Sequence, residues 1–407
     1  MIQRDIIAGL DIGKSKVTLA AARIKNGDIG LIGSRAVQNS GVKDGAVVDL
    51  DALTEAILEA REKLEEKNGI KLSSVYVNIS GINVKADSVR SQITLSARGS
   101  EITEKDVEKL LGTARTVAVP LDRDLIHIFV QDYIVDGQAG VKNPLGLYAT
   151  KLECNTFAIT ARHSSVQNIT RSVNFAGLEV AALALTSLAN SYAVLSEEER
   201  QLGVALLDIG SDLTEVSIFR DGKIRFLDII QYGGEYVTNA IAQNIKVPFE
   251  YAEALKIKHG ALTNIPDEGP EGRPGEDLHI DWGGLNREVT KLELKRLVND
   301  RFSDFLNVLS GCLNNAEEYA KVRAGIVVLG GGAKTEHLPD RIEESMRTRT
   351  RLASLDDEAA GKMDISVTAY GLLKLMALKK NNSGHEGNGG IMGKLFLRAR
   401  SLLEEYF

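Results

Sequence analysis

Two short glycine-containing segments, nearly half the chain apart, carry residue types suited to binding a phosphate group. The first reads DIGKSK (11–16) and the second reads DIGSD (208–212). Each follows an apolar run and precedes an alternating one, which predicts a tight β-hairpin with its glycine at the tip. Glycine permits close approach of a ligand to the backbone, and consecutive amides form an anion-binding concavity. We therefore expect two matching phosphate-binding turns, the alternative being two ordinary tight turns.

The side chains of these turns divide between phosphate and a metal. The residues expected to contact the phosphates are Gly13, Lys14, Ser15, Lys16, Gly210, Ser211 and Asp212. The two serines can donate to phosphate oxygens, and Lys14 or Lys16 can neutralise charge while the other is solvated. Asp11 and Asp208 would repel the anion unless Mg²⁺ lies between, usually with waters kept in its shell. The pattern thus predicts a nucleotide held with Mg²⁺.

Two further features extend the predicted site toward the nucleoside. Gly330, Gly331 and Gly332 end a buried strand predicted at 324–329, and this loop could pass under the nucleoside. Glu253 and Lys256 are three residues apart on a predicted helix, so they share one face. Such a pair is most often a surface ion pair. Beside a nucleotide cleft it could instead bond to ribose hydroxyls and the base.

The strands and helices that must position these residues occur in two similar halves. Both hairpins continue through Asn-Gly or Asp-Gly turns into a further strand, which indicates a duplicated domain facing itself across a cleft. Residues 49–68 predict a helix and 75–79 a buried strand, while 164–196 predict helix, strand and helix. Residues 83–162 differ in pattern, with short strands around a helix that begins near Thr103, where Thr103 and Asp106 suit an N-cap with an acidic N3 residue. We expect a small α+β insert there.

Composition excludes several classes of protein. The 407 residues are 43% apolar and 26% charged, which excludes disorder as the main state. A formal charge of −7 argues against nucleic acid as a partner, and two distant cysteines argue against a disulfide scaffold. The start lacks the pattern of a secretory signal, and no apolar run is long enough to span a bilayer. No metal-ligand cluster or Ser-His-Asp set stands out among six scattered histidines.

The last residues predict a tethered amphipathic helix. Residues 379–390 contain no large apolar side chain and predict a flexible linker. On a helical wheel, one arc of 391–407 holds Ile391, Met392, Leu395, Phe396, Ala399, Leu402, Leu403, Tyr406 and Phe407. A core helix has the same pattern, but a flexible tether does not dock a helix at a fixed site. We expect this helix to lie in a membrane interface, with Lys394, Arg398 and Arg400 meeting anionic headgroups.

Taken together, these segments resemble the actin/Hsp70/sugar-kinase superfamily, and within it the chain is identified as a member of the FtsA family of bacterial cell-division proteins. The resemblance covers essentially the whole chain. It rests on GLDIGKSKV (9–17), VNISG (77–81), GVALLDIGSDLTEVSI (203–218), YGGEYVT (232–238), AEALKIKHG (252–260) and VVLGGGA (327–333). It implies an α/β, actin-like (ribonuclease H-like) duplicated fold with an FtsA-type α+β insert. The fold would have two halves around a nucleotide cleft and four subdomains in all.

The resemblance also implies a division of the chain. It assigns subdomain 1A to 1–82, 163–197 and 355–378, the inserted subdomain 1C to 83–162, subdomain 2A to 198–232 and 301–354, subdomain 2B to 233–300, the linker to 379–390 and the amphipathic helix to 391–407. It adds Gly233 and Gly234 to the nucleotide-binding residues and makes the nucleotide ATP with Mg²⁺. FtsZ contacts would fall on subdomain 2B, with Lys295, Arg296, Asn299 and Arg301 as candidates. The alternative for these four is a solvated helical face.

On this resemblance the chain polymerises on the cytoplasmic face of the inner membrane, at the division septum, and tethers FtsZ filaments there. Its partners would be FtsZ, itself, later division proteins and anionic lipids. Lys14 and Asn83 depart from the family pattern. No Gln or Glu in 184–194 can position an attacking water, since Thr186 and Ser187 stand there, so we expect at most a slow ATPase. The alternatives are an actin-like adaptor of a pilus or secretion machine, or a small-molecule kinase.

Overall fold

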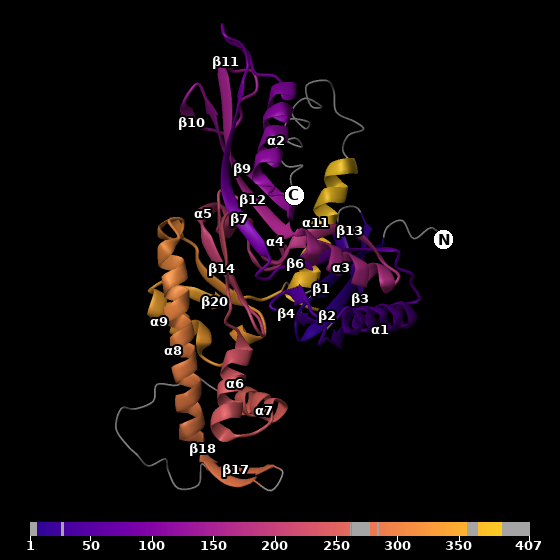
Figure 1. The fold of residues 1–407 in the computed structure, drawn as a ribbon, viewed down its shortest axis with the longest axis vertical. Helices are drawn as coiled ribbons and strands as arrows, with labels where there is room; N and C mark the ends of the chain where they lie inside the picture. Colours follow the sequence, from indigo (N-terminus) through magenta and orange to yellow (C-terminus); the bar gives the residue numbers. More distant parts are fainter. Residues whose placement is uncertain are drawn as a thin grey trace. The chain divides into compact units, whose positions relative to one another are not determined.

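The computed structural model describes residues 6–25, 28–260, 262, 277–282, 285–355 and 365–384. The described chain forms two compact units. The first comprises the residues up to Gln201, together with Phe219–Leu227 and the part from Ser354 onward. The second comprises Leu202–Ile218 and Asp228–Ala353. Each unit is built around one five-stranded sheet (Figure 1).

The sheet of the first unit has the strand order β13-β6-β1-β2-β3. Its strands are β1 (Ile6–Ile12), β2 (Lys16–Lys25), β3 (Asp28–Gln38), β6 (Ser74–Ile79) and β13 (Glu179–Leu185). The β1–β2 and β2–β3 pairs are antiparallel, whereas β6 runs parallel to both β1 and β13. The first predicted hairpin is therefore present, and its turn joins the central strand β1 to its neighbour β2.

Consecutive residues of β1 and β2 are buried, because helices cover both faces of this sheet. α1 (Leu50–Asn68) packs on β2 and β3 and against α3 (His163–Phe175), while α4 (Thr186–Val194) packs against α11 (Val367–Gly384). α1 lies where the sequence predicts it. The Asp49 side chain accepts from the Ala52 N–H at 3.0 Å at its start, and Gly69 at φ 62° ends it.

The last described helix is longer than predicted. The sequence predicts that it ends at Leu378 and that a flexible linker begins at 379, but α11 continues to Gly384. Lysine and asparagine at 379–382 do not break a helix, and no glycine or proline occurs there before Gly384. The remainder of the predicted linker and the predicted amphipathic helix 391–407 lie outside the described residues.

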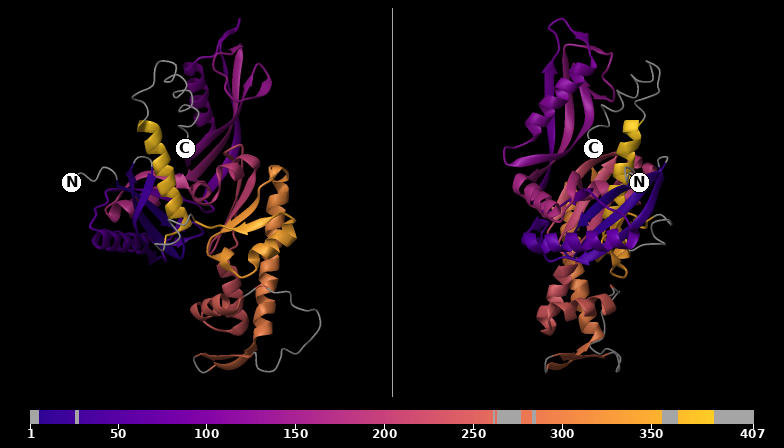
Figure 2. Two further views of the ribbon diagram at one scale, coloured as in Figure 1. Left: turned by 180° about the vertical axis from the view of Figure 1, so that it is seen from behind. Right: turned by 90° about the vertical axis from the view of Figure 1, so that its right-hand side faces the viewer.

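The insert has a sheet of its own within the first unit, with the order β10-β9-β12-β7. Its elements are β7 (Val84–Thr94), α2 (Glu104–Ala118), β9 (Arg123–Val135), β10 (Gln138–Val141) and β12 (Lys151–Arg162). α2 lies along this sheet, and the two bury a shared apolar core that includes Leu110, Tyr133 and Leu152 (Figure 2). At the start of α2, the Thr103 N–H and hydroxyl donate to the Asp106 carboxylate at 2.9 and 2.6 Å, as its sequence predicts.

The second unit repeats the sheet of the first, with the order β16-β15-β14-β19-β20. Its strands are β14 (Val204–Ile209), β15 (Thr214–Arg220), β16 (Lys223–Ile230), β19 (Gly325–Leu329) and β20 (Thr350–Leu352). β19 runs parallel to both β14 and β20, as β6 does to β1 and β13. This matching order confirms the predicted duplication.

The turn of the β15–β16 hairpin belongs to the first unit, which includes Phe219–Leu227. Asp221 and Gly222 both have positive φ, 53° and 72°, as a two-residue hairpin turn requires. Beside it, Lys223 Nζ donates to the Val130 carbonyl at 2.6 Å. Gln131 Nε2 donates to the Ile224 carbonyl at 3.2 Å.

Within the described residues of the second unit, α-helices accompany the sheet. They are α6 (Gly234–Ile245), α7 (Phe249–His259), α8 (Lys291–Asn315) and α9 (Leu338–Met346). α8 contacts the other three and runs without a break through position 300, where the sequence places a subdomain boundary. The predicted short strand at 277–282 is present as β17 (Asp277–Trp282), paired with β18 (Leu285–Thr290).

The shorter elements are β4 (Val42–Lys43), β5 (Ala46–Val47), β8 (Ser100–Glu101), β11 (Tyr148–Ala149), α5 (Glu197–Leu202) and the 3-10 helices Tyr319–Lys321 and Gly332–Lys334. In the part of the chain that is described, no helix combines the length and the apolarity that crossing a bilayer requires.

Candidate nucleotide-binding site

The two predicted phosphate turns are closed by the same backbone hydrogen bond. In the first, the Gly13 N–H donates to the Lys16 carbonyl at 3.1 Å. In the second, the Gly210 N–H donates to the Leu213 carbonyl at 2.8 Å. Lys14 with Ser15, and Ser211 with Asp212, therefore form the two tips, each at the end of a buried strand.

Two asparagines hold the first turn in place. Asn39 Nδ2 donates to the Gly13 carbonyl at 2.7 Å, and its backbone N–H donates to the Ser15 carbonyl at 3.1 Å. Asn78 accepts from the Ile12 N–H at 2.7 Å. Sequence reasoning did not select either residue. The available signal was a polar Asn78 within the otherwise apolar strand β6.

Asn78 also connects the first turn to the start of α4. Its Nδ2 donates to Thr186 Oγ1 at 3.1 Å, and that hydroxyl donates to the Ile79 carbonyl at 3.3 Å. Thr186 is only 6% exposed. The hydroxyl that the sequence places near an attacking water is thus engaged in supporting the turn.

Asp11 is a partly buried carboxylate at the base of the first turn. Burial raises its pKa to about 6, although a hydrogen bond with Ser366 and the positive charge of Lys16 both oppose that rise. A divalent cation beside Asp11 would favour the ionised form. Among the described residues, no group of three or more histidine, cysteine or acidic side chains is arranged to hold a metal.

The backbone of α6 holds the second turn. The Gly234 N–H donates to the Gly210 carbonyl at 3.0 Å, and the Glu235 N–H donates to the Ser211 carbonyl at 2.7 Å. A Cβ on Gly233 would lie 2.5 Å from the Ser211 carbonyl oxygen, so only glycine fits there. Ser211 Oγ donates to Glu235 Oε1 at 2.8 Å, so phosphate would have to replace Glu235 as its acceptor.

Glu253 and Lys256 share one face of α7, as predicted, and form an ion pair of 2.7 Å. Lys256 Nζ also donates to the Gly234 carbonyl at 3.0 Å and to Thr238 Oγ1 at 2.8 Å. The Lys256 side chain is 12% exposed, so this is not a solvated surface pair. It fastens α7 to the first turn of α6, directly behind Gly233 and Gly234.

The third glycine loop meets the second turn from the side of β19. Gly330 has φ 92°, and a Cβ there would lie 2.5 Å from Asp208 Oδ1. Gly332 packs equally closely on Ile209, whereas a Cβ on Gly331 would meet nothing within 4 Å. The second unit therefore brings together Asp208, Gly210 and the loop 330–332, with Gly331 open.

Comparisons with known proteins identify the family. A family model described as "Cell division protein FtsA" matches residues 205–371, and one described as "SHS2 domain inserted in FTSA" matches 81–160. The cell division protein FtsA of Pseudomonas aeruginosa is 32% identical over 388 residues, which cover 93% of this chain and 91% of the relative. The chain belongs to the FtsA family. FtsA of Escherichia coli (strain K12) is 30% identical, over 86% of this chain and 84% of the relative.

Solved structures more distant than the FtsA relatives confirm the predicted actin-like fold. The "PilM-PilN type IV pilus biogenesis complex" matches with a TM-score of 0.62 at 17% identity, covering 92% of this chain and 98% of that one. MreB5 of Spiroplasma citri bound to ADP matches with a TM-score of 0.56 at 15% identity, covering 95% and 100%. At these identities the likeness concerns the fold alone.

The four residues that the FtsA resemblance offers for FtsZ lie on α8. Arg296 is exposed. Arg301 is engaged within the unit, since Nη1 lies 3.0 Å from Asp304 Oδ2 and donates to the Tyr236 hydroxyl at 3.2 Å. Asn299 Nδ2 donates to the Lys295 carbonyl at 2.9 Å. Arg296 is therefore the candidate that a partner would reach most easily.

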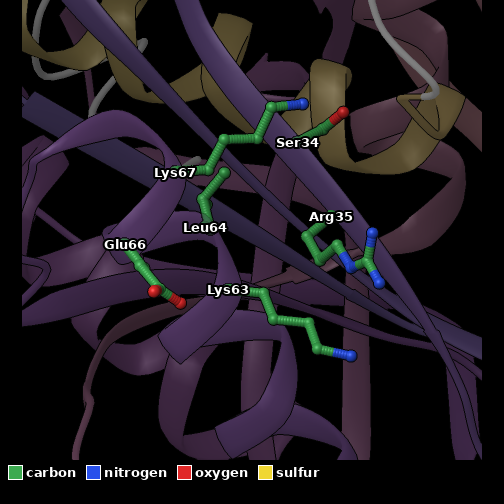
Figure 3. Close-up of a pocket in the computed structure, with 6 residues that line it drawn as sticks. All are labelled: Ser34, Arg35, Lys63, Leu64, Glu66 and Lys67. Carbon is green, nitrogen blue, oxygen red and sulfur yellow. The ribbon is translucent and has the colours of Figure 1, made fainter.

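A cavity of about 370 Å³ lies elsewhere in the first unit of this FtsA-family chain, between β3 and α1 (Figure 3). Its lining residues are Ser34, Arg35, Lys63, Leu64, Glu66 and Lys67. None of them belongs to the predicted nucleotide site. The cavity is thus separate from the candidate site described above.

Proposed function

We propose that this chain is an ATP-binding, actin-like division protein that polymerises on the cytoplasmic membrane and tethers FtsZ filaments there. The observation that carries the nucleotide part is the pair of matching turns, each at the same place in a duplicated sheet. The actin-like fold of nucleotide-binding relatives, including a MreB bound to ADP, supports it.

In this proposal the turns of both units contact the nucleotide. The first turn binds phosphate through its backbone, Ser15 and its two lysines. The second turn contributes Gly210–Asp212, while Gly331 offers an open surface for the nucleoside. Gly233, Gly234, Glu253 and Lys256 support the second turn from behind. Mg²⁺, when bound, offsets phosphate charge, and Asp11 and Asp208 are the carboxylates that would hold it through water.

We infer at most slow ATP hydrolysis. A fast ATPase needs a group that orients the attacking water. Thr186 stands near the expected position, but its hydroxyl bonds to Asn78 and Ile79. A turnover of several ATP per second by purified protein with Mg²⁺ would contradict this inference.

The membrane part of the proposal rests on the sequence of 391–407, which lies outside the described residues. A large apolar face flanked by Lys394, Arg398 and Arg400 suits an interfacial helix. Many such helices on one filament would bind jointly and so more firmly than one. We further propose the division septum as its location and later division proteins as its partners, and membership of the FtsA family supports both. The alternative of a pilus adaptor rests on likeness of fold alone.

Liposome pelleting tests the anchor. Leu402→Asp places a charge within the apolar face, so we expect it to abolish pelleting with anionic vesicles while ATP binding is unchanged. Ser401→Asp is the matched control, because it adds the same charge on the polar face. If Leu402→Asp pelleted like the unmodified chain, the anchor would be wrong. Filaments on a lipid monolayer with ATP and FtsZ, seen only when 390–407 are present, would support the whole proposal.

A further inference from the structure

Strand β9 of the insert reaches the start of α4 through a buried histidine. His127 Nε2 accepts from the Leu185 N–H at 3.0 Å, and His127 is 5% exposed. Because the backbone N–H is the donor, Nε2 carries no proton, and the ring is neutral with its proton on Nδ1. A helix start has N–H groups without partners inside the helix. The insert therefore supplies the acceptor at this position.

The residue after Leu185 continues the contact toward the first phosphate turn. Thr186 accepts from Asn78, and Asn78 accepts from the Ile12 N–H, one residue before Gly13. Asn78 is 4% exposed. Every bond in this series lies within the first unit, and its three side chains, His127, Thr186 and Asn78, are buried. The series joins β9 to the base of the turn without a solvent-exposed step.

Buried hydrogen bonds of this kind are sensitive to small displacements, since a lost partner leaves a polar group without water. A shift of β9 that withdrew His127 would leave the Leu185 N–H without its acceptor. The start of α4 would then move to recover one, and Thr186 and Asn78 would move with it. The position of the first turn therefore depends on the position of β9.

We propose that β9 of the insert sets the affinity of the first turn for nucleotide, with His127, Thr186 and Asn78 as positioning residues. This inference rests on the proposed nucleotide binding. Coupling of this type is reciprocal, so bound nucleotide stabilises the contact of β9 with α4. A partner that displaces β9 weakens nucleotide binding, and one that holds it strengthens binding.

Matched variants test the positioning roles. Thr186→Val removes the hydroxyl at constant shape, whereas Thr186→Ser keeps it. In titrations of the full chain with a fluorescent ATP analogue and Mg²⁺, we expect Thr186→Val to bind about threefold to tenfold more weakly. Thr186→Ser should bind as the unmodified chain does. Likewise His127→Leu should weaken binding, and His127→Gln, whose amide oxygen can accept, should restore part of it.

The control variant is Asn155→Ala. It removes a 2.9 Å hydrogen bond to Asp132 on the same strand β9, but outside the series that leads to the turn. Unchanged affinity here shows that loosening the insert sheet in general is not sufficient. Equal weakening by Asn155→Ala and Thr186→Val would overturn the inference, as would wild-type affinity of Thr186→Val.

Hydrogen exchange measured by mass spectrometry tests the coupling between bound nucleotide and β9 directly. We expect Mg-ATP to slow exchange in residues 10–16 and also in 125–133 and at Leu185. In Thr186→Val, protection should remain at the turn and disappear from β9. Protection confined to the turn in the unmodified chain would overturn this inference alone. Protection nowhere, at saturating ATP, would overturn the proposed nucleotide binding and this inference with it.

Discussion

The two phosphate turns share their four-residue geometry but are held by different groups. Side-chain amides of Asn39 and Asn78 hold the first, together with the Asn39 backbone N–H. Backbone N–H groups of α6 hold the second. The duplication thus preserves the shape of the turn while its support differs between the two units. Truncating a supporting side chain can therefore loosen the first turn, whereas the second is loosened by a substitution that displaces the backbone of α6.

The difference extends to charge. The first turn carries Lys14 and Lys16, whereas the second carries Asp212 and adjoins Glu235. A helix N-terminus is ordinarily a good anion site. At α6, however, the Gly234 and Glu235 N–H groups are already donated to the carbonyls of the second turn. In the proposed nucleotide site, attraction for phosphate would therefore come mainly from the first unit, and the second unit would mainly provide shape.

The largest effect is expected from breaking the backbone support of the second turn. Gly233→Val would place a side chain against the Ser211 carbonyl, where even a Cβ lies at 2.5 Å. We expect nucleotide affinity to fall at least about a hundredfold, and the free energy of unfolding to fall by about 2–4 kcal/mol. Calorimetric titration and thermal unfolding measure the two effects.

The control for this variant is Gly112→Ala in α2, where an added Cβ meets nothing within 4 Å. It should leave affinity unchanged and raise stability by up to about 1 kcal/mol, because alanine favours a helix. If Gly233→Val bound nucleotide normally, then α6 would not support the second turn.

Asp11→Asn should separate stability from binding in the first unit. Burial raises the pKa of Asp11 from 3.8 to about 6, so folding favours its protonated form and the charge destabilises the nucleotide-free protein above pH 6. Asparagine removes that cost. At pH 7.5 we expect the free energy of unfolding to rise by at most about 3 kcal/mol. Mg-ATP affinity should fall at least about tenfold, because the proposed role of Asp11 is to hold Mg²⁺ through water.

The pH dependence provides the control for Asp11→Asn. The stability difference between variant and unmodified chain should shrink as pH falls through 6 toward 4, because Asp11 then becomes neutral as well. Chemical denaturation at several pH values, without nucleotide, measures this difference. A difference that stayed constant from pH 7.5 to pH 4 would show that the Asp11 charge is not its source.

Local patterns in the sequence sufficed for the local features. The hairpins, α1, the capped start of α2, the Asp221-Gly222 turn and the Glu253–Lys256 pair all follow from neighbouring residues. The supports of the turns do not. Asn78 lies 66 residues from Ile12 and 108 from Thr186, so no periodicity links them. The sequence also does not reveal which side chains are already hydrogen-bonded to each other, as the bond from Ser211 to Glu235 shows.

A moderate effect is expected from loosening the first turn. Asn39→Ala removes the 2.7 Å bond to the Gly13 carbonyl and the acceptor for the Gly41 N–H at 2.9 Å. We expect about threefold to tenfold weaker ATP binding and a free energy of unfolding lower by about 1 kcal/mol. Titration and denaturant unfolding measure these. Ser211→Ala in the second turn should cost less affinity, since α6 still holds that turn. The reverse ranking would contradict the comparison.

The smallest effects concern charge, and they test where attraction for phosphate lies. Lys16→Gln should weaken ATP binding by about threefold at low salt, and Asp212→Asn should strengthen it by about twofold. Both effects should decline in titrations at high salt, because Lys16 is exposed and screened. Lys16 also lowers the pKa of Asp11. Without Lys16, Asp11 gains a proton at higher pH, so Lys16→Gln should weaken Mg-ATP binding more at pH 6 than at pH 8. Equal weakening at both pH values would mean that Lys16 acts on phosphate alone.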